Sequence, residues 1–262
     1  MKQIIAIAGT TIGEAIRRKV LLVILLVGLV FLIVAPSLGA LSARSETTIL
    51  RATMLGIIQL TSAVIAIVLT VYMIPNEIER RTIYTILSKP VQRWQFLLGK
   101  YLGAVGALAL MMLFMTIVMI AVFTGMQNGD FGRAVTLAQA TMMFFVQMSL
   151  LAAVAVCFST FVTPLVNFFL SGGIYLAGSL FAPMFDSLSK QQNTSQFSKT
   201  VTWAMTTFLP NFSYYNVQNP LINPSSTIQN PMSHYLFATG YGLMYISLLL
   251  FIGHYMFDHR EV

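Results

Sequence analysis

Long stretches without a single charged residue constrain this chain more than any other feature of its sequence. One continuous apolar run extends from Ala134 to Pro183, and three others follow Lys19, Arg51 and Lys100. A helix of about 20 apolar residues is long enough to cross the hydrocarbon core of a bilayer. Only 9% of the 262 residues are charged and the mean hydropathy is +0.79, whereas soluble domains carry about 25% charged residues. The chain is therefore an integral membrane protein.

The number of spans follows from how each apolar run fits a bilayer. One helix over 134–183 would be about 75 Å long, more than twice the hydrocarbon thickness of about 30 Å. The proline that ends the segment STFVTP, residues 159–164, stops a helix, so this run folds back as two spans. Residues 186–234 are rich in Asn, Gln, Ser, Thr and Pro and predict a large external loop. We therefore predict one all-α transmembrane domain over residues 1–262 with six transmembrane helices. The predicted spans are 20–41, 53–75, 101–124, 135–159, 165–185 and 235–257.

Basic residues indicate which way the spans face. Six spans place both termini on the same side, and that side carries ten Lys and Arg residues against five on the other. Cytoplasmic loops of membrane proteins carry the excess of basic residues. We therefore predict a multi-pass protein of the plasma (inner) membrane in which both termini and the segment 76–99 are cytoplasmic.

Residues 1–19 predict a helix that lies in the membrane interface before the first span. Ile5, Ala8, Ile12 and Ile16 recur at helical spacing, and charged residues occupy the other faces. A cleaved signal peptide is the alternative, because an apolar run and the small residues ALSA follow the basic residues. The apolar run is long enough to span the bilayer, which favours a retained helix.

The predicted spans contain amides and hydroxyls but no Asp, Glu, Lys or Arg. Ion-coupled transporters usually place charged groups near the bilayer centre, so this pattern disfavours them. Two interpretations of the polar groups stay open: hydrogen bonds between helices, or the lining of a translocation path. These residues are Gln59, Thr61, Ser62, Gln139, Thr141, Gln147, Ser149 and Asn167.

Small residues at two places predict close packing of helices, because they let two backbones approach each other. Gly99 and Gly103 stand four residues apart at the entry to the third span, and Gly172 and Gly173 lie in the stretch SGGIYLAGS. Packing accounts for both groups without any ligand.

Nothing in the sequence predicts catalysis, a cofactor or nucleic-acid binding by this chain. His234 and His254 would lie about 30 Å apart along one helix, too far to share a metal ion, and Cys157 is the single cysteine. The chain has no G-x-x-x-x-G-K-[ST] motif to hold ATP and no block of five like charges. We therefore expect no enzymatic activity, no metal and no nucleic-acid partner.

One internal segment concentrates the charge. NEIERRTIYTILSKPVQRWQFLLGK, residues 76–100, holds seven of the 23 acidic and basic residues. Pro90 disfavours a helical conformation at the residue before it, and apolar residues with Trp94 among them begin a new helix after it. The pattern predicts a short amphipathic helix, a sharp turn and a re-entering span. Taken by composition alone, the segment is a solvated connector between the second and third spans.

The same segment resembles the cytoplasmic signature of ABC-2 type permeases, the membrane subunits of one class of ATP-binding-cassette transporters. That family includes the permease of the nitrous-oxide-reductase maturation system. The family pattern is an acidic residue, then Gly-Thr, then Leu-Leu-Ser-x-Pro, then Arg and a Gly-Lys before a span. It falls here on Glu79, Thr82, Leu87, Ser88, Pro90, Arg93, Gly99 and Lys100. Arg81 stands where the family often has glycine, and LPNFSYYNV (209–217) is similar to a Leu-Pro-Asn segment of the family's external loop.

The resemblance implies a division of labour between subunits. Two permease copies, in a homodimer or a heterodimer, pair in the lipid bilayer, and separate ATPase subunits that bind ATP and Mg²⁺ dock beneath them. The segment 76–99 acts as the coupling helix. The residues implied in coupling and ATPase docking are Glu77, Glu79, Arg80, Arg81, Thr82, Leu87, Ser88, Lys89, Pro90 and Arg93.

The predicted function is therefore ATP-dependent movement of a substrate across or out of the membrane. A channel or secondary transporter that works without a partner is an alternative, and so is a non-transporting anchoring subunit of a membrane complex. The aromatic residues of the external loop either meet a periplasmic substrate or partner or pack on one another as a cap. They are Trp203, Phe208, Phe212, Tyr214 and Tyr215.

Overall fold

The computed structural model describes residues 2–40, 46–79, 92–126, 131–181, 209–215 and 231–258, together with Gln196, Thr200 and Trp203. All secondary structure within these residues is helical. The elements are α1 (Lys2–Arg17), α2 (Lys19–Ala40), α3 (Glu46–Val71), α4 (Met73–Glu79), α6 (Arg93–Met126), α7 (Phe131–Ser159), α8 (Pro164–Leu176), the π-helix η1 (Ala177–Phe181), the 3₁₀ turn η2 (Phe212–Tyr215) and α11 (Pro231–Asp258).

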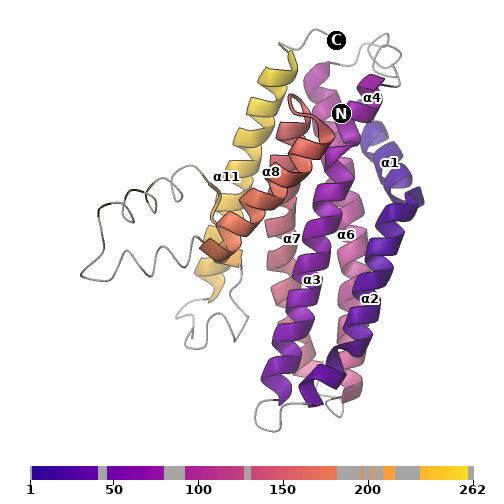
Figure 1. Ribbon diagram of the computed structural model, residues 1–262, viewed down its shortest axis with the longest axis vertical. Helices are drawn as coiled ribbons and strands as arrows, with labels where there is room; N and C mark the ends of the chain where they lie inside the picture. Colours follow the sequence, from indigo (N-terminus) through magenta and orange to yellow (C-terminus); the bar gives the residue numbers. More distant parts are fainter. Residues whose placement is uncertain are drawn as a thin grey trace.

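Five helices of the described residues are long and apolar enough to cross a membrane: α2, α3, α6, α7 and α11. They run alongside one another down the long axis of the molecule, with the start of α1 and the end of α11 at the same end of the bundle (Figure 1). The multi-pass helical architecture predicted from the apolar runs is confirmed. Six spans, the external loop 186–234 and the interfacial position of residues 1–19 stay predictions.

The predicted fifth span, 165–185, has a different form. α8 has 13 residues, about 20 Å of helix, and it continues through the five-residue π-helix η1. Figure 1 shows α8 slanting across the bundle and ending well before its far end. The last four residues of the predicted span, 182–185, lie outside the described residues, so a full span over 165–185 stays a prediction.

Two prolines account for the breaks between helices. Pro75 cannot continue α3, because its ring would meet the carbonyl of Val71, and α3 ends at that residue. Pro164 occupies the first turn of α8, after Thr163 in an extended conformation with φ −69° and ψ 153°. α7 ends at Ser159, so the chain reverses within STFVTP, where the sequence places the break.

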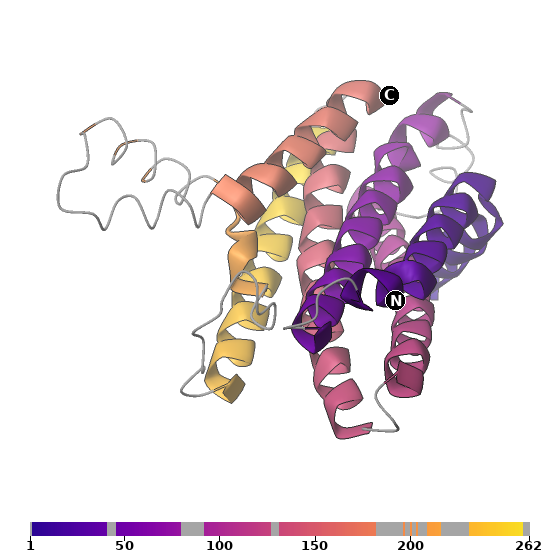
Figure 2. The same ribbon diagram turned by 60° about the horizontal axis from the view of Figure 1, so that its bottom comes forward.

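α3 and α7 form the centre of the bundle. Within their span windows 67% and 72% of residues are buried, against 22% in both α2 and α11. Figure 2 shows α8 and α11 on one side of this central pair and α1 and α2 on the other. The interior is filled with alanine, leucine and methionine side chains, including Met111, Met115 and Met119 of α6. Methionine suits such irregular gaps because its side chain is unbranched and flexible.

Candidate functional site

A buried ion pair lies where α4 and α6 meet, at the two ends of the predicted coupling segment. Lys100 Nζ of α6 donates to Glu77 Oε1 of α4 at 2.6 Å, and Glu14 Oε2 of α1 lies 3.8 Å from the same nitrogen. The side chains of Lys100, Glu77 and Glu14 are 5%, 16% and 54% exposed. Lys100 and Glu77 are therefore the tightly held pair, and Glu14 is a third member screened by solvent. We call these three residues the Lys100 cluster.

The length of α6 explains why charged residues occur here. α6 has 34 residues, which is about 51 Å of helix and exceeds the hydrocarbon thickness of about 30 Å. Arg93 and Lys100 are both at its N-terminal end, so this is the end that projects from the apolar layer. The Lys100 ammonium, with Nζ 5.8 Å from the centre of the Phe96 ring, is also packed against an aromatic face.

Arg93 joins the start of α6 to the end of α11. Its Nη1 donates to the carbonyl oxygens of Phe257 at 2.9 Å and Asp258 at 3.2 Å. Its Nε lies 3.8 Å from Asp258 Oδ1, and its Cζ lies 5.7 Å from the centre of the Phe257 ring. The last carbonyls of a helix have no partner within the helix, and a cation there interacts favourably with the helix dipole. Arg93 therefore acts as a C-terminal cap for α11.

α1 packs against a glycine stripe on the same end of α6. A methyl group on Gly99 would lie 2.9 Å from Ile7 Cβ, and one on Gly103 would lie 2.5 Å from Thr11 Cβ. Gly106 extends the stripe, because a methyl group there would lie 2.8 Å from Ile12 Cδ1. At Gly99 and Gly103 these distances leave no room for a side chain, so these two glycines set how closely the helices approach. At Gly106 the near atom is the end of a flexible side chain, so glycine is less strictly required there. Sequence reasoning found the first two glycines but neither Gly106 nor the identity of the partner helix.

The other two glycines expected to pack closely do not do so within this chain. A methyl group on Gly172 or Gly173 would have no atom within 4 Å. The glycine that does pack closely in this region is Gly178, where a methyl group would lie 2.5 Å from the carbonyl oxygen of Pro210. The close approach at this end of α8 is to the chain that follows it, since η2 packs against η1.

Most of the predicted docking residues lie outside the described residues: Arg80, Arg81, Thr82, Leu87, Ser88, Lys89 and Pro90. Glu79 ends α4, and its side chain also lies outside them. Glu77 and Arg93 have described side chains, and both are engaged within the bundle. They anchor the two ends of the segment to the bundle.

The polar side chains of the spans connect helices to one another. Gln59 Nε2 of α3 donates to Gln147 Oε1 of α7 at 3.1 Å, and Gln147 Nε2 donates to the carbonyl oxygen of Phe212 at 3.2 Å. Asn167 Nδ2 of α8 donates to the carbonyl oxygen of Ala155 in α7 at 2.9 Å. For these three side chains the structure supports the packing interpretation rather than a polar path. Within the described residues, no group of three or more His, Cys, Asp and Glu is arranged to hold a metal ion.

The segment that contains η2 turns back into the bundle. Phe212 and Tyr215 are 0% and 1% exposed, and Tyr215 Oη donates to the carbonyl oxygen of Ala238 in α11 at 3.0 Å. Burial raises the pKa of the Tyr215 phenol, and the neighbouring Tyr241 raises it further, so the group stays protonated and donates. A methyl group on Gly242 would lie 2.6 Å from Tyr215 Oη, so glycine at this position makes room for the phenol.

The described aromatic residues of the predicted external loop pack within the molecule, with one exception. Tyr214 makes edge contacts with Phe237 and Tyr241 of α11, with ring centroids 5.9 and 5.5 Å apart. Trp203 is 63% exposed, and Phe208 lies outside the described residues. Phe212, Tyr214 and Tyr215 therefore pack on the helices of the bundle rather than on one another as a cap.

Comparison with known proteins covers almost the whole chain. A family model described as ABC-2 family transporter protein matches residues 5–262. No curated protein sequence matches the chain. The match includes all five candidate spans, the Lys100 cluster and the segment with η2.

Proposed function

The chain belongs to the ABC-2 transporter family, and from this premise we propose that it is a permease subunit driven by a separate ATPase that docks on residues 78–92. The family implies a membrane component of a transporter that associates with an ATP-binding-cassette ATPase. ATP and Mg²⁺ would be bound by that partner. Two copies of this chain would form the membrane unit, and substrate would be moved across or out of the bilayer.

The observation that supports the proposal best is how the coupling segment is anchored. Glu77, at its start, pairs with Lys100, and Arg93, at its end, holds the final carbonyls of α11. A push on the residues between these two anchors would reach α6 directly and α11 through Arg93. Through the Lys100 cluster it would also reach α1. A flexible connector without such anchors would transmit little of that motion.

Charge would govern how the ATPase fits rather than how tightly it binds. Exposed ion pairs are worth only about 0–1 kcal/mol each, but complementary charges set the register of an interface. Glu79, Arg80, Arg81 and Lys89 are the charged residues between the two anchors. We assign this end of the bundle to the cytoplasmic side because it carries the same basic residues, and cytoplasmic loops hold the excess of Lys and Arg.

The test replaces those four residues with serine and leaves Glu77 and Arg93 in place, so that the bundle anchors are kept. The chain is purified from its native host membrane by a C-terminal tag, and co-purifying ATPase and its turnover in lipid nanodiscs are measured. We expect the variant to insert normally and to lose most of the ATPase. Serine at Arg44 and Arg133, which the predicted topology places on the other side of the membrane, is the matched control and should keep it. If the fourfold variant assembles and turns over normally, the segment is only a connector and the proposal is wrong.

A further inference from the structure

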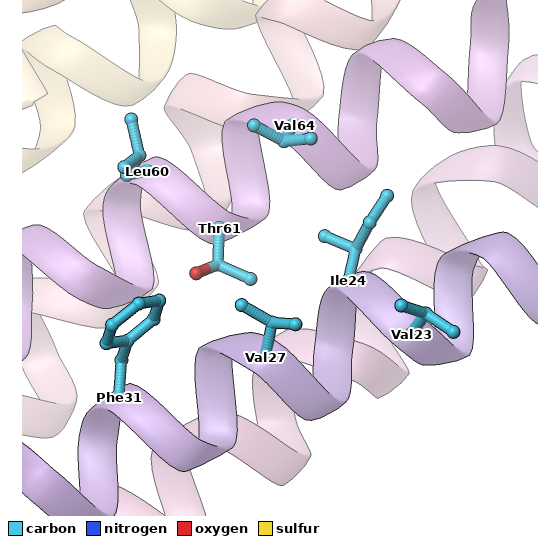
Figure 3. Close-up of a pocket in the computed structure, with 7 residues that line it drawn as sticks. All are labelled: Val23, Ile24, Val27, Phe31, Leu60, Thr61 and Val64. Carbon is cyan, nitrogen blue, oxygen red and sulfur yellow. The ribbon is translucent and has the colours of Figure 1, made fainter.

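A narrow apolar groove opens on the outer face of the bundle between α2 and α3. Figure 3 shows its side chains along neighbouring parts of the two helices, with Thr61 of α3 directed toward Val27 of α2. Its volume is about 270 Å³, just below the range of about 300–1,000 Å³ that drug-sized ligands occupy. The lining residues are Val23, Ile24, Val27, Phe31, Leu60, Thr61 and Val64.

The chemistry of the groove suits a hydrocarbon chain. Its one polar residue is Thr61, whose side chain is packed against α2: a methyl group on Gly28 would lie 2.6 Å from Thr61 Cγ2. Val23 and Phe31 are 61% and 58% exposed, so the groove faces the surrounding lipid rather than the interior of the bundle. From Val23 to Phe31 it extends about 12 Å along α2, which is long enough for a large part of one acyl chain.

Basic residues lie at one end of the groove. Lys19 is one turn before Val23 on the same face of α2, and Arg17 and Arg18 directly precede it. Lys19 begins the first candidate span, which places it at the depth of lipid headgroups. The nearest acidic residue in the sequence is Glu14, whose ion pair is with Lys100. The three basic side chains therefore have no acidic partner among the described residues.

α3 contributes a further polar group at this depth. α3 runs antiparallel to α2, and Thr61 lies opposite Gly28, so the eleven residues from Thr61 to Tyr72 bring Tyr72 level with Arg17. Tyr72 is 45% exposed. Tyrosine is enriched at membrane interfaces, where its ring lies among apolar groups and its hydroxyl reaches the headgroups.

We propose that this groove binds an anionic phospholipid, with one acyl chain between α2 and α3 and the phosphate against Arg17, Arg18 and Lys19. The site does not depend on the proposed ATPase coupling, only on the chain being in a membrane. A second copy of the chain is the competing occupant. A two-fold contact through this face would bring the two basic clusters together at the same depth, and like charges at an interface oppose association. The charge at the end of the groove therefore favours the lipid.

Photo-crosslinking tests the site directly. p-Benzoylphenylalanine replaces Phe31 in the groove or, as the matched control, Phe114 on the lipid-facing side of α6. Phe31 and Phe114 are 58% and 50% exposed. The protein is placed in nanodiscs of phosphatidylcholine and phosphatidylglycerol at a ratio of 3:1, irradiated, and the lipid adducts are identified by mass spectrometry. We expect adducts at position 31 to be enriched at least fivefold in phosphatidylglycerol over those at position 114, because each basic residue near the surface favours anionic lipid by about that factor.

Two variants separate the headgroup end from the chain groove. Arg17→Gln/Arg18→Gln/Lys19→Gln should return the adducts at position 31 to the bulk lipid ratio, and Lys19→Gln alone should lower the enrichment in part. Val27→Trp should fill the groove and reduce all lipid adducts at position 31 while leaving those at position 114 unchanged. The proposal is wrong if both positions give the bulk ratio, if the triple variant keeps the enrichment, or if the main adduct at position 31 is a second copy of the chain.

Discussion

Replacing Lys100 with methionine should destabilise the protein more than any other single change at the charged end of the bundle. Methionine keeps most of the volume and the apolar stem of lysine but removes the ammonium. Glu77 Oε1 would then lose the partner that lies 2.6 Å from it, in a place where its side chain is only 16% exposed. The contact with Phe96 would become an ordinary apolar one.

The magnitude follows from burial. Removing one member of a buried ion pair costs about 3–5 kcal/mol, because the remaining charge loses its main compensation. Glu77 keeps some access to water, so we expect the lower end, about 3 kcal/mol. Glu14→Gln breaks the other contact of the same lysine, at 3.8 Å and with Glu14 54% exposed, and should cost at most about 1 kcal/mol. The double variant Lys100→Met/Glu77→Met, with both charges gone, should recover most of the loss.

The measurement is the free energy of unfolding in mixed dodecylmaltoside–SDS micelles, followed by circular dichroism for the wild type and the three variants. The expected order of stability is wild type, Glu14→Gln, the double variant and Lys100→Met. Equal midpoints for Lys100→Met and Glu14→Gln would refute the argument, because they would mean that Glu77 is hydrated in the native protein. Failure of the double variant to recover would show that the loss arises from packing rather than from an unpaired charge.

Two further predictions concern the loop segment and the topology. Gly242→Val should displace Tyr215, whose Oη would lie 2.6 Å from the new Cβ, and should lower the free energy of unfolding by about 1–3 kcal/mol through overpacking. Thermal unfolding measures this loss. The control is Gly172→Val, which has no atom within 4 Å of the new Cβ and should cost less than 1 kcal/mol. Single cysteines at Gln92 and Gln191 should differ in whole cells: an impermeant thiol reagent should label position 191 and not position 92, and the reverse pattern contradicts the proposed orientation. The native Cys157 is buried and should give no background.

The helical content and several helix ends follow from local sequence, because they depend on apolar length and on proline. α2 begins one residue before the predicted first span, 20–41, and the predicted break at 159–164 coincides with the end of α7 and the start of α8. Each of these features is decided by residues close together in the chain. The short length of α8 is not decided by nearby residues, because the π-helix that follows α8 packs against Pro210 and Phe212 from further along the chain.

The electrostatic contacts could not be predicted in the same way. Glu77 and Lys100 are 23 residues apart, and Arg93 reaches carbonyl oxygens 164 and 165 residues away. In the sequence each is one of seven charges in a polar segment, and the natural interpretation is that all of them face a partner. Burial distinguishes the charged residues that pair within the bundle from those that face outward, because a charge that leaves water must be paired. Only the packing of α1, α4, α6 and α11 shows which of them are buried.

The difference between buried and outward-facing charges changes how the coupling segment would work under the proposed function. Its two ends belong to the transmembrane bundle, and the contacts that hold them differ in strength. Glu77–Lys100 is short and shielded, and Arg93 is held by two carbonyl oxygens, a carboxylate and a ring, whereas Glu14 reaches Lys100 only at 3.8 Å and is open to water. A motion imposed between the two ends would therefore move α4, α6 and the end of α11 together, and it would carry α1 with α6, because α1 packs closely on the glycine stripe. On this argument α1 should keep its position relative to α6 between states of the transporter, and a cysteine pair placed across the interface of α1 and α6 should crosslink equally in each state.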